Sequence, residues 1–329
     1  MSVLRFFFVI LRGNFIGMTI TELQQQYAAH PNMVVMKRLL KDTSVQTVFC
    51  GGLCASAASL FSSVLVQEGG CPFVFILGDL EEAGYFYHDL TQILGTERVL
   101  FFPSSFRRSI KYGQKDAANE ILRTEVLSRL QKGEEGLCIV TYPDALAEKV
   151  VSRKELSNKT LKLNVGEKVD TTFITDVLHS YGFEYVDYVY EPGQYAVRGS
   201  IIDVFSFASE YPYRIDFFGD EVESQLSREK KDGVSIVPDL AVTGDVTTSF
   251  LDFIPKETTL AMRDFLWLRE RIQVVHDEAL TPQAIAVQEA EENGGITLEG
   301  KLIDGSEFTV RALDFRRLEF GNKPTGTPN

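Results

Sequence analysis

The sequence predicts an α/β protein in which a parallel-sheet domain is joined by an inserted α+β domain with an antiparallel sheet. Two observations support this prediction. Residues 44–150 alternate apolar strand-like runs with segments that have apolar residues at helical spacing, which is typical of parallel strands joined by crossover helices. Residues 183–227 have no helical pattern and contain consecutive strand-like runs separated by turn signals, as an antiparallel sheet requires.

The first domain is expected to begin at Met18, where "MTITELQQQYAAHP" has a helical pattern. Residues 1–17 are an N-terminal extension, disordered or misassigned, because their apolar core is shorter than a secretory h-region and has no small-residue cleavage site after it. We therefore expect a cytoplasmic protein without membrane association. Four buried strands follow in "VQTVFC", "PFVFILG", "RVLFFP" and "GLCIVTY", with helices between them that end at Gly95 and Gly133.

The junction after the first of these strands reads "GGLCASAASLF". A phosphate-binding loop has the pattern G-x-x-x-x-G-K-[ST] at such a place. Aligned on Gly52, this pattern puts Ala57 at the second glycine, Ala58 at the lysine and Ser59 at the hydroxyl. The domain is thus P-loop-NTPase-like but degenerate, and we expect no nucleotide binding because the lysine that reaches the β/γ-phosphates is missing.

The inserted domain is expected from about residue 148 to 234. A strand "LKLNV" and a helix ended by Gly182 precede the runs "FEYVDYVY", "YAVRGSIIDVFSF", "YPYRIDFF" and "EVESQLS". Gly219–Asp220 is a two-residue hairpin turn, and Gly199 predicts a bend or bulge. The parallel-sheet region resumes in residues 235–320, with strand-like "TTLAM", "ITLEGKLI" and "RRLEFG", so the first domain spans 18–147 and 235–320. Residues 321–329 have the composition of a linker.

The charge of the chain disfavours one class of function. The net charge is −13, which repels phosphate backbones, and no basic run offsets it, so we do not expect autonomous nucleic-acid binding. The four cysteines form no C-x-x-C pair and the four histidines are scattered, so we expect buried free thiols, no metal site and no cofactor.

One strand has the composition of a protein-binding surface. In "YRIDFF", alternation places Tyr213, Ile215 and Phe217 on the core face, with Arg214, Asp216 and Phe218 on the other. An arginine with an exposed phenylalanine is typical of interface hot spots, and Arg198 can approach Arg214 if their strands pair. Alternatively, both arginines simply form ion pairs with neighbouring carboxylates.

The stretch "EPGQYAVRGSIIDVF…YRIDFFGDEVES" resembles the UvrB-homology module of bacterial transcription-repair coupling factors (Mfd) and, more loosely, the excision repair protein UvrB. Every position of the family pattern R-G-x-[IL]-[IL]-D-[IV]-F, followed by R-[IL]-[DE]-[FL]-F-x-D-E-[IV]-[ED]-S, is met. "LEEAGYFYHDL", "RVLFFP" and "GLCIVTYPDAL" extend the similarity into the first domain. The resemblance implies a UvrB-like fold.

Two departures favour the coupling factor over UvrB. UvrB has an intact P-loop and a long aromatic hairpin that probes damaged DNA. This chain has Ala58 at the lysine position and only the short "SSFRRSIKYGQ" where the hairpin would be. The resemblance therefore implies a module that kept the fold and lost catalysis, so that this chain is not an enzyme.

The resemblance also implies the partner. In this family the middle domain recruits the damage-recognition protein UvrA, and the matching positions are Arg198, Arg214, Phe218, Asp220 and Glu221. Full-length members continue into an RNA-polymerase-binding domain and an ATP-dependent DNA translocase that displaces stalled RNA polymerase, so contacts with polymerase and DNA belong to those other domains. We expect a monomer. The alternatives are a catalytically active UvrB-like P-loop ATPase and a nucleic-acid-binding module.

Overall fold

The computed structural model describes residues 2–5, 19–53, 56–68, 71–105, 117–226, 233–240, 246–281 and 298–321. The chain forms two compact units. Unit 1 consists of residues 1–104, 133–148 and 249–329, and unit 2 of residues 105–132 and 149–248.

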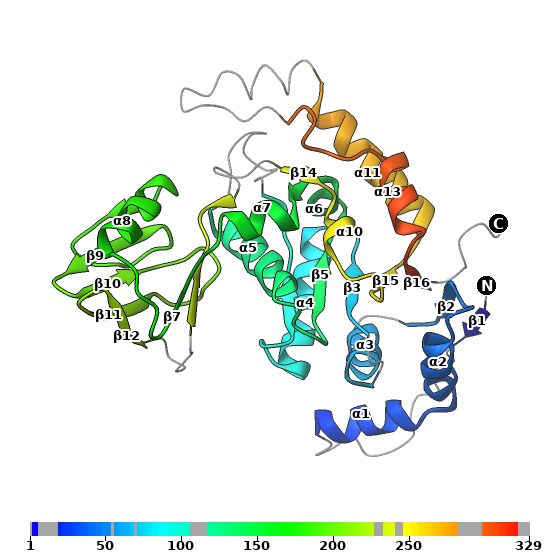
Figure 1. The fold of residues 1–329 in the computed structure, drawn as a ribbon. Helices are drawn as coiled ribbons and strands as arrows, with labels where there is room; N and C mark the ends of the chain where they lie inside the picture. Colours follow the sequence, from blue (N-terminus) through cyan, green and yellow to red (C-terminus); the bar gives the residue numbers. More distant parts are fainter. Residues whose placement is uncertain are drawn as a thin grey trace. The chain divides into compact units, whose positions relative to one another are not determined.

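A parallel sheet forms the centre of unit 1 (Figure 1). Within the described residues its order is β1-β2-β16-β15-β3-β5-β4, and every neighbouring pair is parallel. Strands β2, β3, β5 and β15 are almost wholly buried, which explains why their sequences are continuous apolar runs. The strands are β1 Ser2–Arg5, β2 Thr47–Gly51, β3 Phe73–Ile76, β4 Val99–Phe101, β5 Cys138–Thr141, β15 Thr259–Met262 and β16 Arg316–Gly321.

Several helices of unit 1 begin at residues whose side chains cap them. Thr19 and Glu22 form a reciprocal capping box at the start of α1, and Asp79 caps α4. Gly95 ends α4 with φ of +85°, as predicted. The helices are α1 Ile20–Ala29, α2 Pro31–Lys41, α3 Ser56–Glu68, α4 Leu80–Leu94, α6 Pro143–Ala147, α10 Phe250–Phe253, α11 Phe265–Ala279 and α13 Gly305–Ala312.

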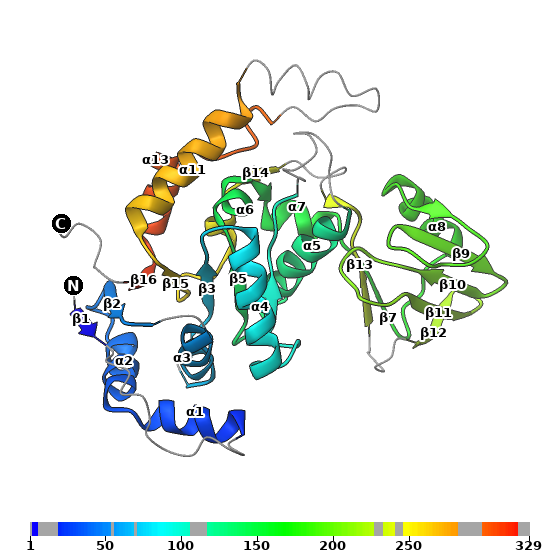
Figure 2. The same cartoon turned by 180° about the vertical axis from the view of Figure 1, so that it is seen from behind.

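The two C-terminal strands lie in the middle of the sheet. β15 and β16 lie between β2 and β3, so that residues more than 200 positions apart are direct neighbours in the sheet. Helices α11 and α13 lie side by side in both views (Figures 1 and 2). The strand expected in residues 296–303 is wrong for its described part, because residues 298–303 form a turn whose Leu302 makes only a single bridge to Glu148.

Unit 2 is built on a five-stranded sheet of order β12-β11-β10-β9-β8. Its pairs are antiparallel except β8 with β9. Two short antiparallel pairs, β13 with β7 and β14 with β6, accompany it. The strands are β6 Val150–Val151, β7 Leu161–Asn164, β8 Glu184–Tyr185, β9 Gln194–Arg198, β10 Ile201–Val204, β11 Tyr213–Phe218, β12 Glu221–Leu226, β13 Gly233–Ile236 and β14 Val246–Thr248.

Helix α8, Thr171–Ser180, supplies the packing for one face of this sheet. Its Ile174 and Leu178 are fully buried in one hydrophobic cluster with Ile202, Ile215 and Phe217 from the sheet. The opposite face of the sheet is therefore the one that is left to solvent. The other helices of unit 2 are α5 Ala117–Gln131 and α7 Arg153–Asn158.

The turn at Gly199 differs from its prediction. The sequence favoured a bend or bulge within one long strand, but Arg198 pairs with Ile201, so Gly199 and Ser200 form a two-residue hairpin turn between β9 and β10. Gly199 has φ of +62°, a conformation that glycine adopts without steric cost. The hairpin at Gly219–Asp220 between β11 and β12 was predicted correctly.

The predicted fold class, a parallel-sheet α/β domain with an antiparallel α+β domain, is confirmed. The domain boundaries at 147/148 and 234/235 remain a prediction; by compactness, residues 105–132 group with unit 2. Residues 2–5 form β1, while the rest of the predicted N-terminal extension lies outside the described residues. So do residues 322–329 of the predicted linker and residues 106–114 of the segment "SSFRRSIKYGQ".

Candidate functional site

Strand β11 presents its side chains as the alternation predicts. Ile215 and Phe217 are buried against the core of unit 2. Arg214 and Phe218 point to the other face and are exposed, and the Phe218 residue is 77% exposed. The sheet therefore shows solvent a face on which charged and aromatic side chains stand together.

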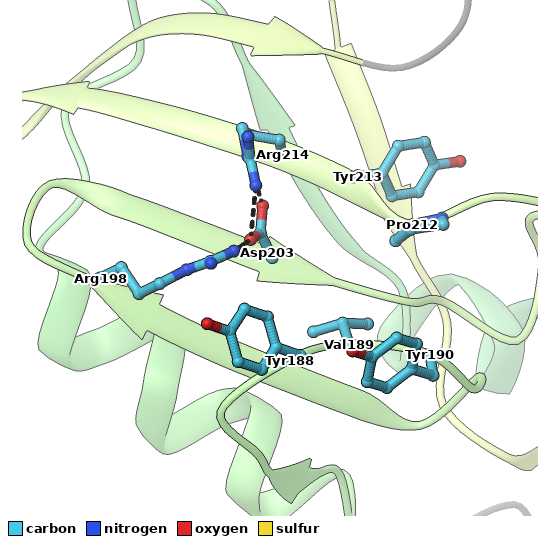
Figure 3. A pocket seen from close by; sticks show the side chains of 8 residues that line it. All are labelled: Tyr188, Val189, Tyr190, Arg198, Asp203, Pro212, Tyr213 and Arg214. Carbon is cyan, nitrogen blue, oxygen red and sulfur yellow. Dashed lines mark hydrogen bonds and ion pairs between the residues drawn. The ribbon is translucent and has the colours of Figure 1, made fainter.

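Asp203 on β10 joins the two arginines of this face (Figure 3). In the strand register it lies directly opposite Arg214 of β11 and opposite Ala196 of β9, two residues from Arg198. Arg214 donates from Nε to Asp203 Oδ1 at 2.7 Å and from Nη2 to Oδ2 at 3.0 Å. Arg198 Nη2 donates to the same Oδ2 from the diagonal position. The arginine strands are thus not neighbours, and the arginines meet at a shared carboxylate.

These contacts change the acidity of the groups involved. Hydrogen bonds from Arg214, together with those from Arg198 and the charges of both arginines, hold the pKa of the Asp203 carboxyl below its usual range, although partial burial acts in the opposite direction. The same carboxylate raises the pKa of Arg214. Asp203 and Arg214 are therefore both charged at neutral pH, and Asp216, two residues from Arg214 on the same strand, also acts on Arg214 through its charge.

The ion pairs leave both arginines accessible. The Arg198 and Arg214 side chains remain 44% and 46% exposed, whereas the Asp203 side chain is only 9% exposed. Ion pairing with a neighbouring carboxylate, the alternative that the sequence left open, is therefore present, but it does not cover the arginines. A guanidinium has five N–H donors, so each arginine keeps donors that this carboxylate does not use.

The remaining predicted positions lie at the far end of β11. Phe218 is four residues from Arg214, or roughly 13 Å along the strand. It pairs in the register with Glu221 beside the Gly219–Asp220 turn. The Asp220 carbonyl accepts a hydrogen bond from Val169 N–H at 2.7 Å, which anchors this turn. Phe218, Asp220 and Glu221 thus form one exposed hairpin end on the strand that also bears Arg214.

A hollow of about 400 Å³ lies beside the arginine cluster (Figure 3). The loop between β8 and β9 contributes two tyrosines to it, Tyr188 and Tyr190, and Arg198 lies 5.4 Å above the ring of Tyr188. Its lining residues are Tyr188, Val189, Tyr190, Arg198, Asp203, Pro212, Tyr213 and Arg214. Aromatic and cationic side chains therefore share one concave surface.

The described residues of the strand-to-helix junction in unit 1 lie where a P-loop would begin and end. β2 ends at Gly51, Gly52 has φ of +90°, and Ala57, Ala58 and Ser59 lie in α3. The Ser59 hydroxyl is buried and donates to Asp89 Oδ2 of α4 at 2.9 Å. The hydroxyl that would face a bound magnesium in a functional loop is therefore engaged in helix–helix packing.

Sequence reasoning missed three residues of the site. Asp203 was part of the family pattern, and its strand alternation against the buried Ile202 and Val204 could have placed it on the arginine face. Tyr188 and Tyr190 were contained in a run interpreted as a strand. The density of tyrosines in "YVDYVY" could have indicated a site. The loop geometry that places Tyr188 beside Arg198 could not be predicted from the sequence.

The described residues contain no group of three or more side chains suited to hold a metal ion. In the same part of the chain, no helix is long and apolar enough to cross a bilayer. Burial raises the pKa of the Cys50 and Cys138 thiols, so neither is poised for reactivity.

The sheet that bears the arginine face lies in the part of the chain that matches a known family. Residues 161–237 match the family described as "UvrB interaction domain", and this stretch contains all the strands of the five-stranded sheet. The chain is 32% identical over 186 residues to the transcription-repair-coupling factor of Bacillus subtilis and 27% identical over 194 residues to that of Escherichia coli. The resemblance stated from the sequence, to the N-terminal UvrB-homology module of these coupling factors, is confirmed.

These similarities cover limited parts of the chains. The matches to the Bacillus subtilis and Escherichia coli proteins each cover 56% of this chain and 16% of the relative. A relative from Staphylococcus aureus (strain USA300) is 25% identical over 215 residues, which cover 64% of this chain and 18% of that protein. The chain thus spans about one sixth of the length of the curated relatives that it matches.

Proposed function

We propose that this chain is a non-catalytic recruitment module of nucleotide excision repair that binds UvrA through the exposed sheet face of unit 2. The binding residues are Arg198, Arg214 and Phe218, with Asp220 and Glu221 on the adjoining hairpin end. The family of residues 161–237 supports a role in this repair system.

The arginine cluster is the observation that supports this proposal most. Asp203 holds Arg214 through two parallel hydrogen bonds and Arg198 through a third, so both guanidiniums are fixed before any partner arrives. Fixing a flexible side chain in advance lowers the entropic cost of binding. Arginines in such fixed positions present a planar fork to carboxylates, so we expect acidic side chains on UvrA.

Phe218 supplies the apolar contact of the proposed surface. The residue is 77% exposed, so burial does not explain an aromatic residue here, and it lies at the end of β11 next to an anchored turn. Aromatic and arginine residues carry most of the energy of protein interfaces, while surrounding residues mainly exclude water.

The junction of unit 1 supports the non-catalytic part of the proposal. Without a lysine at position 58, a bound nucleotide would have no point charge for its terminal phosphates. The bond between Ser59 and Asp89 gives this junction a packing role instead. An active P-loop ATPase would need a lysine at position 58 and a Ser59 hydroxyl that is not bonded to Asp89.

We further propose that the chain is the N-terminal part of a transcription-repair coupling factor and acts as a monomer. In this proposal, ATP-driven translocation on DNA and displacement of stalled RNA polymerase reside in other parts of the full-length protein. A cytoplasmic location follows from that role.

The test is the affinity of the whole chain for UvrA, measured with single variants. Arg198→Ala, Arg214→Ala and Phe218→Ala should each weaken binding by about thirtyfold, or about 2 kcal/mol. Melting temperatures should stay close to wild type, because exposed substitutions usually change stability by only about 0.5 kcal/mol.

Two variants serve as matched controls. Arg269 on α11 has a side chain that is 43% exposed, like that of Arg214, and Phe173 on α8 is 56% exposed. Arg269→Ala and Phe173→Ala should bind UvrA as the wild type does. If Arg214→Ala unfolds the protein, the arginine is a structural residue. Full-strength binding by all three site variants would place the interface elsewhere.

A further inference from the structure

The hollow beside the arginine cluster has an unusual lining for a surface of this acidic chain. Tyr188 and Tyr190 are 61% and 77% exposed, and their rings lie 6.5 Å apart. Tyr213 and Pro212 bound the hollow from the other side (Figure 3). Large exposed aromatic side chains gathered around a concave surface mark a binding site more often than a solvated face.

The tyrosine loop is held in place by its backbone. Gln194 Oε1 accepts hydrogen bonds from the N–H groups of Tyr190 and Glu191, at 3.0 and 3.1 Å. Val186 N–H donates to the Tyr195 carbonyl at 2.9 Å. Hydrogen bonds thus hold the backbone at both ends of the loop while the tyrosine rings stay exposed, which lowers the cost of ordering the loop on binding.

The charges around the hollow define its occupant. Arg198 and Arg214 both bond Asp203, and Asp216 acts on Arg214 from the same strand, but both arginine side chains stay nearly half exposed at the wall of the hollow. Exposed acidic residues adjoin the lining residues in the sequence, because Asp187 and Glu191 flank the two tyrosines and Glu210 lies two positions before Pro212. A run of negative charges would be repelled by this rim, whereas a single carboxylate can pair with the arginines inside it.

We propose that the hollow receives a segment of the protein partner in which one acidic side chain pairs with Arg198 and Arg214 and an adjacent apolar side chain packs against Tyr188 and Tyr190. The inference rests on the proposed function, because UvrA is the partner with which it is tested. It adds a tyrosine subsite that lies away from Phe218, and it assigns the charge and polarity of what binds there.

The experiment measures the affinity of the whole chain for UvrA after substitution of the tyrosines. Tyr188→Ala and Tyr190→Ala should each weaken binding by about tenfold or more. The control is Tyr185→Ala, because Tyr185 is 60% exposed on β8 but does not line the hollow. It should bind within twofold of wild type.

A second pair of variants tests the charge of the occupant. Tyr190→Lys and Tyr190→Glu remove the same ring and add opposite charges, so an acidic occupant should bind the lysine variant about tenfold more tightly than the glutamate variant. Equal affinities, or the opposite order, would overturn the assignment of an acidic occupant.

The outcomes separate this inference from the proposed function. If Tyr188→Ala and Tyr190→Ala bind at full strength while Arg214→Ala does not, the tyrosine subsite is wrong and UvrA recruitment by the arginine face stands. If Arg214→Ala also binds at full strength, the proposed function itself fails. The melting temperature of each variant shows whether it still folds. If Tyr188→Ala does not fold, the affinity of Tyr190→Ala tests the subsite, because Tyr190 is the more exposed of the two.

Discussion

Asp203 organises the candidate site although it is itself nearly buried. Its two oxygens accept three hydrogen bonds from two arginines, so that without it the two guanidiniums would lose the group that joins them. Hydrogen bonds to charged groups contribute about 1.5–3 kcal/mol each when well formed, but half-exposed arginines are screened by water, so the lower end applies here.

This arrangement predicts a specific pH dependence. The folded pKa of Asp203 is depressed, so its ion pairs contribute fully above the unfolded pKa of about 3.9 and are lost as the pH falls through the lower folded value. Asp203→Asn should therefore reduce the free energy of unfolding by about 1–2 kcal/mol, and by the same amount at every pH from 7 to about 5.

Urea unfolding of wild type and Asp203→Asn across pH 3–7 measures this difference. It should begin to shrink only below about pH 4, where the carboxyl of the unfolded chain starts to bind protons, and it should disappear as the pH falls through the lower folded pKa. A difference that already shrinks between pH 7 and 5 would show that the carboxyl has a raised pKa, and hence that the arginines do not hold it as described.

At the scale of elements, the hairpin of β9 and β10 shows what the sequence could not predict. Apolar alternation correctly placed Ile215 and Phe217 inside and Arg214 and Phe218 outside, because each strand has one buried face. The meeting of Arg198 with Arg214 at Asp203 depends on strand order and register. The register of β9 with β10 follows from the two-residue turn at Gly199, where the sequence indicated a bend or bulge instead.

The parallel sheet illustrates the same limit on a larger scale. The continuous apolar runs of β3 and β5 predicted buried strands, and the return of the α/β pattern after residue 235 was visible. The insertion of β15 and β16 between β2 and β3 depends on contacts between residues that are far apart in the sequence. No local residue pattern encodes it, because any buried apolar strand satisfies the same burial requirement.

Gly193 offers a test of the loop that bears the tyrosines. Its φ is +87°, and a Cβ there would lie 2.9 Å from the Phe207 ring, which is too close for real contacts. Gly193→Ala should therefore lower the free energy of unfolding by about 2–3 kcal/mol, from backbone strain plus the clash.

The matched control for this substitution is Gly166→Ala. Gly166 has a similar φ of +82°, but nothing lies within 4 Å of its Cβ position, so only the strain of about 1–2 kcal/mol applies. Denaturant unfolding of both variants gives the two costs. An equal cost for both would show that Phe207 moves freely and that the loop is not held as tightly as the hydrogen bonds indicate.

For the whole molecule, a net charge of −13 and a degenerate P-loop point away from direct action on DNA or nucleotide. Calorimetric titration of the chain with Mg·ATP should detect no binding at micromolar concentrations. Ala58→Lys alone should not create ATPase activity, because phosphoryl transfer also needs coordinating acids and a positioned water. Micromolar affinity in the wild type would contradict the packing role assigned to Ser59 and Asp89.

The central claim is that this chain recruits UvrA through the arginines held by Asp203. The most direct measurement is the equilibrium affinity of the chain for UvrA, compared between wild type and the double variant Arg198→Ala/Arg214→Ala, with Arg269→Ala as the control. The account predicts saturable binding by wild type and the control, and at least a hundredfold loss for a double variant that keeps its melting temperature within a few degrees. A folded double variant that binds UvrA as tightly as the wild type would contradict it.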